Sequence, residues 1–180
     1  LNGTIPTNND TDGDGMPDGW EVYYGLKPLD SSDAHDDNDG DGYDINRDGF
    51  TSSIEAFTNL EEFLNNTFPS NNDTDNDGMW DGWEVYYNLN PLDAYDATVD
   101  NDLDGFDENY NGTLEVEEEH NNILEFKAGT HPYIADTDAD GMLDGWEWKY
   151  GLNPLNPLDA NADSDGDGLI NRLEYNNTAA

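Results

Sequence analysis

The feature that most constrains the fold of this chain is a twelve-residue acidic segment that occurs three times at an even spacing. "DTDGDGMPDGWE" begins at Asp10, and close copies begin at Asp73 and Asp136, each 63 residues further along the chain. Other acidic clusters keep the same period and begin at Asp37, Asp100 and Asp163. Self-similarity at a period of this length predicts a repeat array, in which each unit buries its apolar face against its neighbours.

The period divides the chain into a lead-in of residues 1–9, a first repeat of residues 10–72, a second repeat of residues 73–135 and a shortened third repeat of residues 136–180. The third repeat lacks a stretch that the first two contain. Both ends of the chain fall inside the pattern, and no signal peptide is present. We therefore expect a processed chain or a segment of a longer one, or subunits that continue one another end to end.

A large excess of negative charge is the second constraint. The 180 residues include 43 Asp and Glu but only 5 Lys and Arg, which gives a formal net charge of −38. Such chains are usually disordered because they cannot bury enough apolar surface to offset their ordering entropy. However, 12% of the residues are aromatic, which is unusual for a disordered acidic tail. Bound cations would remove the repulsion and supply the missing folding free energy.

The same charge excludes several classes of partner. Nucleic acid phosphates would meet no compensating positive surface, and an anionic membrane surface is disfavoured for the same reason. No apolar run approaches the roughly 18–20 residues that a membrane-spanning helix needs. The chain contains no cysteine, so disulfide bonds contribute nothing to its stability.

The spacing of the acidic residues matches that of an EF-hand-type calcium loop. Acidic residues occupy positions 1, 3, 5 and 9, glycine position 6, a backbone carbonyl position 7 and glutamate position 12. Calcium takes six to eight hard oxygens at about 2.3–2.6 Å, and this spacing directs several short carboxylates at one centre. The ligand positions of the first loop are Asp10, Asp12, Asp14, Met16, Asp18 and Glu21.

Five further loops fit the twelve-residue pattern, three of them with Asn or Ser at some positions. We name the loops that begin at Asp10, Asp73 and Asp136 the A loops. Their second and third members are Asp73, Asp75, Asp77, Met79, Asp81 and Glu84, and Asp136, Asp138, Asp140, Met142, Asp144 and Glu147. The other three loops are Asp163, Asp165, Asp167, Leu169, Asn171 and Glu174; Asp44, Asn46, Asp48, Phe50, Ser52 and Glu55; and Asp107, Asn109, Asn111, Thr113, Glu115 and Glu118.

Two shorter clusters lie just before the loops at Asp44 and Asp107. They consist of Asp37, Asp39, Asp41 and Tyr43, and of Asp100, Asp102, Asp104 and Phe106. The Asp37 cluster has no acid at position 9, and the two clusters would have to use Asp48 or Asn111 at position 12 and so share ligands with the next loop. We expect six strong Ca²⁺ sites and up to about eight in all. Mg²⁺ is a weaker candidate because it retains its waters.

Short helices are expected after the loops. Each A loop leads into a sequence such as "GWEVYYGLKPL", which predicts a helix of about two turns that ends at a left-handed Gly25, Asn88 or Gly151. Longer helices are predicted over Ser52–Leu64 and Glu115–Lys127. Because Trp20, Trp83 and Trp146 recur at one position, we expect core packing for them, and surface contacts for the non-recurring Trp80 and Trp148.

Signals of an enzyme are absent from the sequence. His35, His120 and His131 are isolated, without a nucleophile or zinc-ligand spacing, and we expect them on the surface. The metal pattern already accounts for the carboxylates, although a glycosidase pair among 43 acids stays open as a minor alternative. The sequence therefore predicts no catalytic residues.

Asn-X-Thr sequons predict N-linked glycans if the chain is exported. The sequons at Asn2, Asn65 and Asn176 stand clear of the loops and are the favoured acceptors, followed by Asn9 and Asn72. A glycan on Asn111 would compete with its expected role as a ligand.

The run "DTDGDGMPDGWEVYYGLKPLD" and the later "DSDGDGLINRLEY" resemble the thrombospondin type 3-like repeats of secreted and surface-anchored bacterial and archaeal proteins. The resemblance covers almost the whole chain. It implies a calcium-wrapped, mostly irregular chain with short α-helices and little or no β-sheet, used outside the cell as a stalk, spacer or adhesive element.

We therefore expect a calcium-stabilised extracellular structural protein, a glycosylated filament, stalk or surface-layer component that self-associates end to end. The alternative is a calcium-dependent adhesin or spacer module of a larger secreted protein or enzyme.

Overall fold

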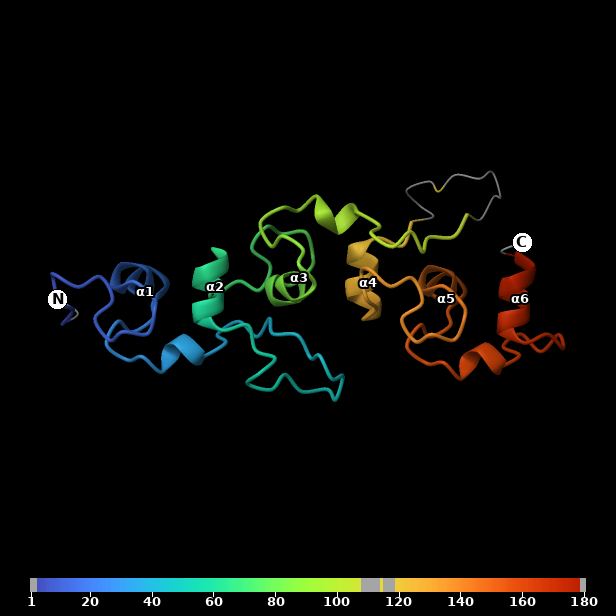
Figure 1. Cartoon of the computed structure of the whole chain (residues 1–180), viewed down its shortest axis with the longest axis horizontal. Helices are drawn as coiled ribbons and strands as arrows, with labels where there is room; N and C mark the ends of the chain where they lie inside the picture. The colour runs from blue at the N-terminus through green and yellow to red at the C-terminus, as the bar shows by residue number, and fades with distance from the viewer. Residues whose placement is uncertain (1–2, 108–113, 115–118, 179–180) are drawn as a thin grey trace. The chain divides into compact units, whose positions relative to one another are not determined.

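The computed structural model describes residues 3–107, 114 and 119–178 (Figure 1). Their contacts divide the chain into two compact units, Leu1–Ala94 and Tyr95–Ala180. Within these residues, six short α-helices and three single-turn 3₁₀ helices are joined by long irregular segments. Among the described residues, extended pairing is limited to one bridge between Phe68 and Asn71. The predicted fold class, an array of calcium-type loops and short helices, is confirmed, whereas the three repeat boundaries remain a prediction.

The first unit contains α1 (Asp18–Tyr24), the 3₁₀ helix η1 (Asp33–His35), α2 (Asn59–Asn65) and α3 (Asp81–Tyr87). In Figure 1, α1 and α3 are seen end-on, while α2 lies across the view. Helix α2 packs against η1.

The second unit repeats this arrangement. It contains η2 (Asp96–Thr98), α4 (Asn122–Ala128), α5 (Asp144–Tyr150), η3 (Asp159–Asn161) and α6 (Asn171–Thr178). Helix α4 packs against η2, and α6 packs against η3. Every A loop therefore leads into a short helix, and every second helix of a repeat rests on a 3₁₀ turn.

The helices that follow the A loops end where the sequence predicted. Gly25, Asn88 and Gly151 have φ angles of 82°, 58° and 72°, in the left-handed region. The N–H of each residue donates to a carbonyl of the last helical turn, and this satisfies groups that the helix end would otherwise leave unpaired. The two-turn helices and their stop signals are confirmed.

The prediction of longer helices was wrong. Helix α2 begins at Asn59, after Thr58, whose side chain forms a capping box with Glu61. From Ser52 the chain makes only one turn, in which the N–H groups of Glu55 and Ala56 donate to the Ser52 carbonyl, both at 2.9 Å, and residues 56–58 are not helical. In the second unit α4 begins only at Asn122, and residues 115–118 lie outside the described part of the chain.

The apolar core is small and sits beside the A loops. Met16, Met79 and Met142 are fully buried. Trp83 and Trp146 are also buried, as predicted. Trp20 is only half-buried and packs edge-on against Phe63, with ring centroids 5.3 Å apart. Trp80 and Trp148 are exposed, as expected of surface residues. So few apolar side chains leave much of the interior to acidic ones, which become the central feature of the fold.

Candidate metal centres

The acidic loops share one backbone arrangement. In six of them the carboxylate at position 1 accepts a hydrogen bond from the glycine N–H at position 6, at 2.7–3.4 Å, which closes the turn over the acidic side chains. Position 4 is always left-handed, with positive φ at Gly13, Gly40, Arg47, Asn76, Leu103, Ala139 and Gly166. Because the turn depends on these local contacts, the sequence pattern alone locates it.

The first A loop gathers its carboxylates around one buried point. Asp14, Glu21 and Asp33 each bring an oxygen within 4.8 Å of the others, and Glu21 is completely buried. Six oxygens of Asp12, Asp14, Glu21 and Asp33 are buried without a hydrogen-bond donor among the described residues. Asp33, on η1, was missed by the sequence analysis, although Asp96 and Asp159 recur at the same period. Six convergent hard oxygens fit the coordination number of Ca²⁺.

The aspartate at position 9 of each A loop accepts hydrogen bonds from the threonine at position 2. The Asp18 carboxylate accepts hydrogen bonds from the Thr11 N–H and hydroxyl, at 2.7 and 2.8 Å. Asp81 and Thr74 form the same pair at 2.8 and 2.7 Å. Asp144 and Thr137 repeat it at 2.9 and 2.6 Å. These pairs hold the start of the loop to the start of its helix.

The cluster at Asp37 closes in a way the sequence analysis did not foresee. Glu62, in the first turn of α2, lies with Asp41 and Asp81 in one buried group whose ligand atoms are within 4.8 Å of one another. Asp48 instead accepts from the Phe50 N–H within the next loop. The structure thus brings Glu62, and not Asp48, to the cluster.

The loop beginning at Asp37 is therefore split. It runs from Asp37 to Gly42, is interrupted by 14 residues (43–56), and resumes from Phe57 to Glu62. The uninterrupted third copy, Asp163–Glu174, supplies the register, with Asn171 at position 9 and Glu174 at position 12. We name the loops that begin at Asp37, Asp100 and Asp163 the B loops.

A buried asparagine at position 9 confirms this register in all three B loops. The Nδ2 groups of Asn59, Asn122 and Asn171 donate to the carbonyls of Asp33, Asp96 and Asp159, at 2.7, 2.8 and 2.8 Å. Each asparagine thus ties a B loop to the 3₁₀ turn that carries the extra aspartate of the A loop. An alignment of the first two B loops with the third, with a 14-residue gap in the third, would reveal this register from the sequence.

The second B loop gathers Asp104, His120 and Glu125, all buried. Both Glu125 oxygens and both Asp102 oxygens are buried without a donor among the described residues. His120 is 2% exposed, so its predicted place on the surface was wrong. It is buried because the chain re-enters this loop after the interruption at position 7, which His120 occupies inside the loop.

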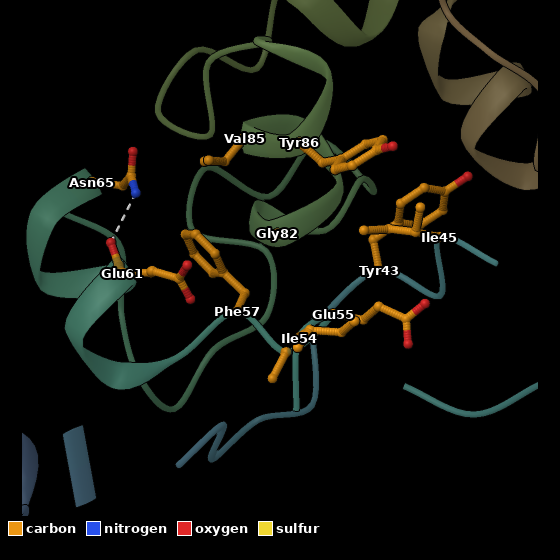
Figure 2. A pocket seen from close by; sticks show the side chains of 11 residues that line it. Tyr43, Ile45, Ile54, Glu55, Phe57, Glu61, Asn65, Gly82, Val85 and Tyr86 are labelled. Atoms are coloured by element: carbon orange, nitrogen blue, oxygen red, sulfur yellow. Dashed lines mark hydrogen bonds between the residues drawn. The ribbon is translucent and has the colours of Figure 1, made fainter. Parts of the chain in front are cut away.

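The loop inside the first interruption, Asp44–Glu55, is built differently, and we name it the nested loop. Glu55 accepts hydrogen bonds from Ser52 and, at 3.2 Å, from the Asn46 N–H. Figure 2 shows the Glu55 carboxylate pointing away from Phe57, which faces Gly82 of α3. The nested loop therefore satisfies its glutamate internally. Its counterpart from Asp107 lies, beyond that first residue, among residues outside the described part, including Asn109, Asn111, Thr113, Glu115 and Glu118.

Electrostatics separates the two kinds of glutamate. Burial, reinforced by neighbouring aspartates, raises the pKa of Glu21 to about 7, of Glu62 and Glu147 to about 9 and of Glu125 to about 10. The Ser52 hydroxyl and N–H instead lower the pKa of Glu55. A buried carboxylate among other carboxylates is stable in its charged form only beside a cation. The buried glutamates thus fit a divalent ion, because their oxygens have no hydrogen-bond donor among the described residues.

The third repeat shows the A-loop arrangement again. Buried oxygens of Asp138, Asp140, Glu147 and Asp159 meet no donor among the described residues. The final B loop, from Asp163 to Asp167, is exposed, and the pKa of Glu174 is raised by partial desolvation and the three aspartates of its loop.

The predicted glycosylation sequons overlap with structural roles. Thr11 and Thr74, which complete the sequons at Asn9 and Asn72, hold the position-9 aspartates. Thr67, which completes the sequon at Asn65, is buried. The amide of Asn176 donates to the Arg172 carbonyl at 2.6 Å, and Asn2 lies outside the described residues. Glycosylation stays a prediction.

Repeated acidic loops with buried, convergent oxygens define a repeat protein whose loops could hold cations. Three stretches of the chain, residues 10–25, 73–94 and 136–157, match the sequence model of the bacterial TSP3 repeat. The chain thus carries bacterial TSP3 repeats, as the resemblance implied. No curated protein and no solved structure matches it.

TSP3 repeats bind calcium and are typical of extracellular proteins, in which they are structural modules. The chain is therefore a calcium-binding protein of the extracellular type. No helix among the described residues is both long and apolar enough to cross a membrane.

Proposed function

We propose that this chain is a calcium-stabilised structural element at the cell surface, part of a filament, stalk or surface layer. The observation that carries the proposal is the set of fully buried glutamates, Glu21, Glu62 and Glu147, whose oxygens meet no donor among the described residues. Calcium at these points would be part of the folded structure and not a transient signal. The A loops, the first and third B loops, the nested loop and its counterpart from Asp107 supply its proposed ligands, six to eight ions in all.

The proposed assembly is end to end. The support is the 63-residue period of the acidic loops, together with the dependence of repeat units on their neighbours for burial. N-linked glycans on exposed sequons would suit such an exterior element.

The experiment is far-UV circular dichroism and analytical sedimentation, with calcium and after its removal. We expect loss of the helices and of any assembly when calcium is removed, and their recovery when it is restored. A fold and an assembly that persist without calcium would contradict the proposal.

A second candidate, a calcium-dependent adhesin or spacer in a larger secreted protein, is favoured by the exposed aromatic side chains. Tyr23, Phe50 and Trp148 are 80%, 77% and 43% exposed. Filaments formed by this chain alone would reject that candidate. A calcium-loaded monomer that binds a cell surface through these aromatics would favour it.

A further inference from the structure

Position 7 of the split B loops holds different side chains in the two units. Phe57 occupies it in the first unit and His120 in the second, and the two are 5% and 2% exposed. Both lie against the equivalent glycine of the following A-loop helix. A Cβ added to Gly82 would be 2.8 Å from the Phe57 Cβ, and one added to Gly145 would be 2.9 Å from the His120 Cβ. The second unit therefore places an imidazole where the first has a phenyl ring.

That imidazole belongs to a cluster of buried acids. Its Nδ1 is 3.1 Å from Oδ2 of Asp104. Asp104, His120 and Glu125 each offer a ligand atom within 4.8 Å of the other two. Glu125 is fully buried, and both of its oxygens, like Nε2 of His120, meet no partner among the described residues.

The donor set differs in kind from that of the other clusters. Calcium is held by oxygen atoms, so an imidazole nitrogen adds nothing to its binding. Imidazole suits Zn²⁺ and its neighbours in the first transition row, with metal–nitrogen bonds of about 2.0–2.1 Å. Two donors bound at the tetrahedral angle at such lengths lie about 3.3 Å apart, close to the 3.1 Å between Nδ1 of His120 and Oδ2 of Asp104.

We propose that His120, Asp104 and Glu125 form a mixed nitrogen–oxygen site that binds a first-row transition-metal dication, with Zn²⁺ as its probe. The matching cluster of Asp41 and Glu62, with Phe57 in place of the histidine, keeps oxygen ligands alone. The site rests on the proposed function only in that the surrounding B loop folds in calcium.

The matched variants are His120→Phe and the reciprocal Phe57→His, because each side chain fills the position the other occupies in the second copy. The full chain, loaded with calcium, is titrated with Zn²⁺ by calorimetry. We expect His120→Phe to weaken the tightest Zn²⁺ binding by at least about 10- to 100-fold, with calcium binding changed much less. Phe57→His is expected to add a second tight Zn²⁺ equivalent.

Zn²⁺ affinity that is unchanged in His120→Phe would overturn the proposal. Equal losses for Zn²⁺ and Ca²⁺ would also reject it, since they would show that His120 only orients Asp104. If His120→Phe does not fold, the unmodified chain decides through the ¹⁵N shifts of the His120 ring. A large shift with one equivalent of Zn²⁺ supports ligation, and no shift refutes it.

Failure of the proposed function gives a different result. It would appear as a fold that is indifferent to calcium in circular dichroism, whatever the Zn²⁺ titration shows.

Discussion

The first B loop and the nested loop share one sequence pattern, but the glutamate at position 12 has opposite surroundings in the two loops. Glu62 ends the B loop fully buried among Asp39, Asp41 and Asp81, and its oxygens have no donor among the described residues. Glu55 ends the nested loop with hydrogen bonds from Ser52 and Asn46. A glutamate at position 12 therefore does not by itself show how strongly the fold depends on a cation.

The largest expected effect is that of pH on the metal-free chain, and it tests the charge state of the B loop. The pKa of Glu62 is about 9 in the folded chain, against an ordinary value of 4.5. The folded state then binds more protons than the unfolded state across this window, so the free energy of unfolding falls as pH rises through it. We expect metal-free protein to be helical near pH 4.5 and to unfold progressively towards pH 9, as followed by circular dichroism.

The nested loop provides the contrast for this measurement. Because the pKa of Glu55 is lowered, its contribution is present above pH 4.5 and is lost as pH falls below that value. Helix content of the metal-free chain that rises with pH would contradict the assignment of the buried glutamates.

The second prediction compares Glu62→Gln with Glu55→Gln. Loss of an ion held at 100 times its dissociation constant costs about 2.7 kcal/mol, and we expect Glu62→Gln to lose about that much stability in calcium. Without calcium the same change removes a repelled charge, so its effect should reverse sign. Glu55→Gln should change stability much less in both conditions. Denaturant unfolding with and without calcium measures all four values, and equal effects of the two variants would refute the distinction.

The third prediction concerns the reach of the B loop into the next helix, which the nested loop does not share. The Gly82 N–H donates to Oδ2 of Asp41 at 3.1 Å, and a Cβ there would lie 2.4 Å from the Asp41 carbonyl oxygen. We expect Gly82→Ala to destabilise the first unit by about 1–3 kcal/mol through overpacking.

Gly19 is the matched control, since nothing lies within 4 Å of a Cβ added to it. Gly19→Ala should be neutral or gain up to about 1 kcal/mol from helix propensity. Thermal unfolding in calcium compares the two variants. Similar destabilisation by both would show that contact with Asp41 is not the cause.

The smallest effect is expected at position 4, where the two split B loops differ. Leu103 has a φ of 61° and is exposed, whereas Gly40 holds the same position in the first copy with a φ of 76°. Leu103→Gly should stabilise the chain by about 1 kcal/mol, since left-handed backbone costs other residues about 1–2 kcal/mol. Gly40→Leu should do the reverse in the same unfolding experiment. A loss of stability in Leu103→Gly would show that its side chain makes a contact worth more than the strain.

Several features of the fold could be predicted from sequence because their causes lie within a dozen residues. The turn of the first A loop depends on Asp10 and Gly15, and the end of α1 on Gly25. The local spacing of such residues is visible in the sequence and specifies the backbone directly. The fold class and the TSP3 resemblance followed from the same local signals.

Other features depend on contacts between distant residues. Glu62 is 25 residues from Asp37 in the sequence, and the complete nested loop lies between them. The spacing of Glu62 from its sequence neighbours therefore indicates a helix and not a metal site. Asp33 looks like an isolated surface acid until η1 brings it to Glu21. His120 was expected on the surface because an interruption of its loop likewise separates it from Asp104 in the sequence. No spacing rule spans an interruption of that length.

The sequence by itself determined the acidic loops, their period, their helix stops and their affinity for cations as a class. Only the tertiary structure decided which glutamate closes each loop and which of them is left buried without a donor from the described chain. The physical reason is that a loop's turn is a property of neighbouring backbone, whereas the burial of a carboxylate depends on what the chain folds over it.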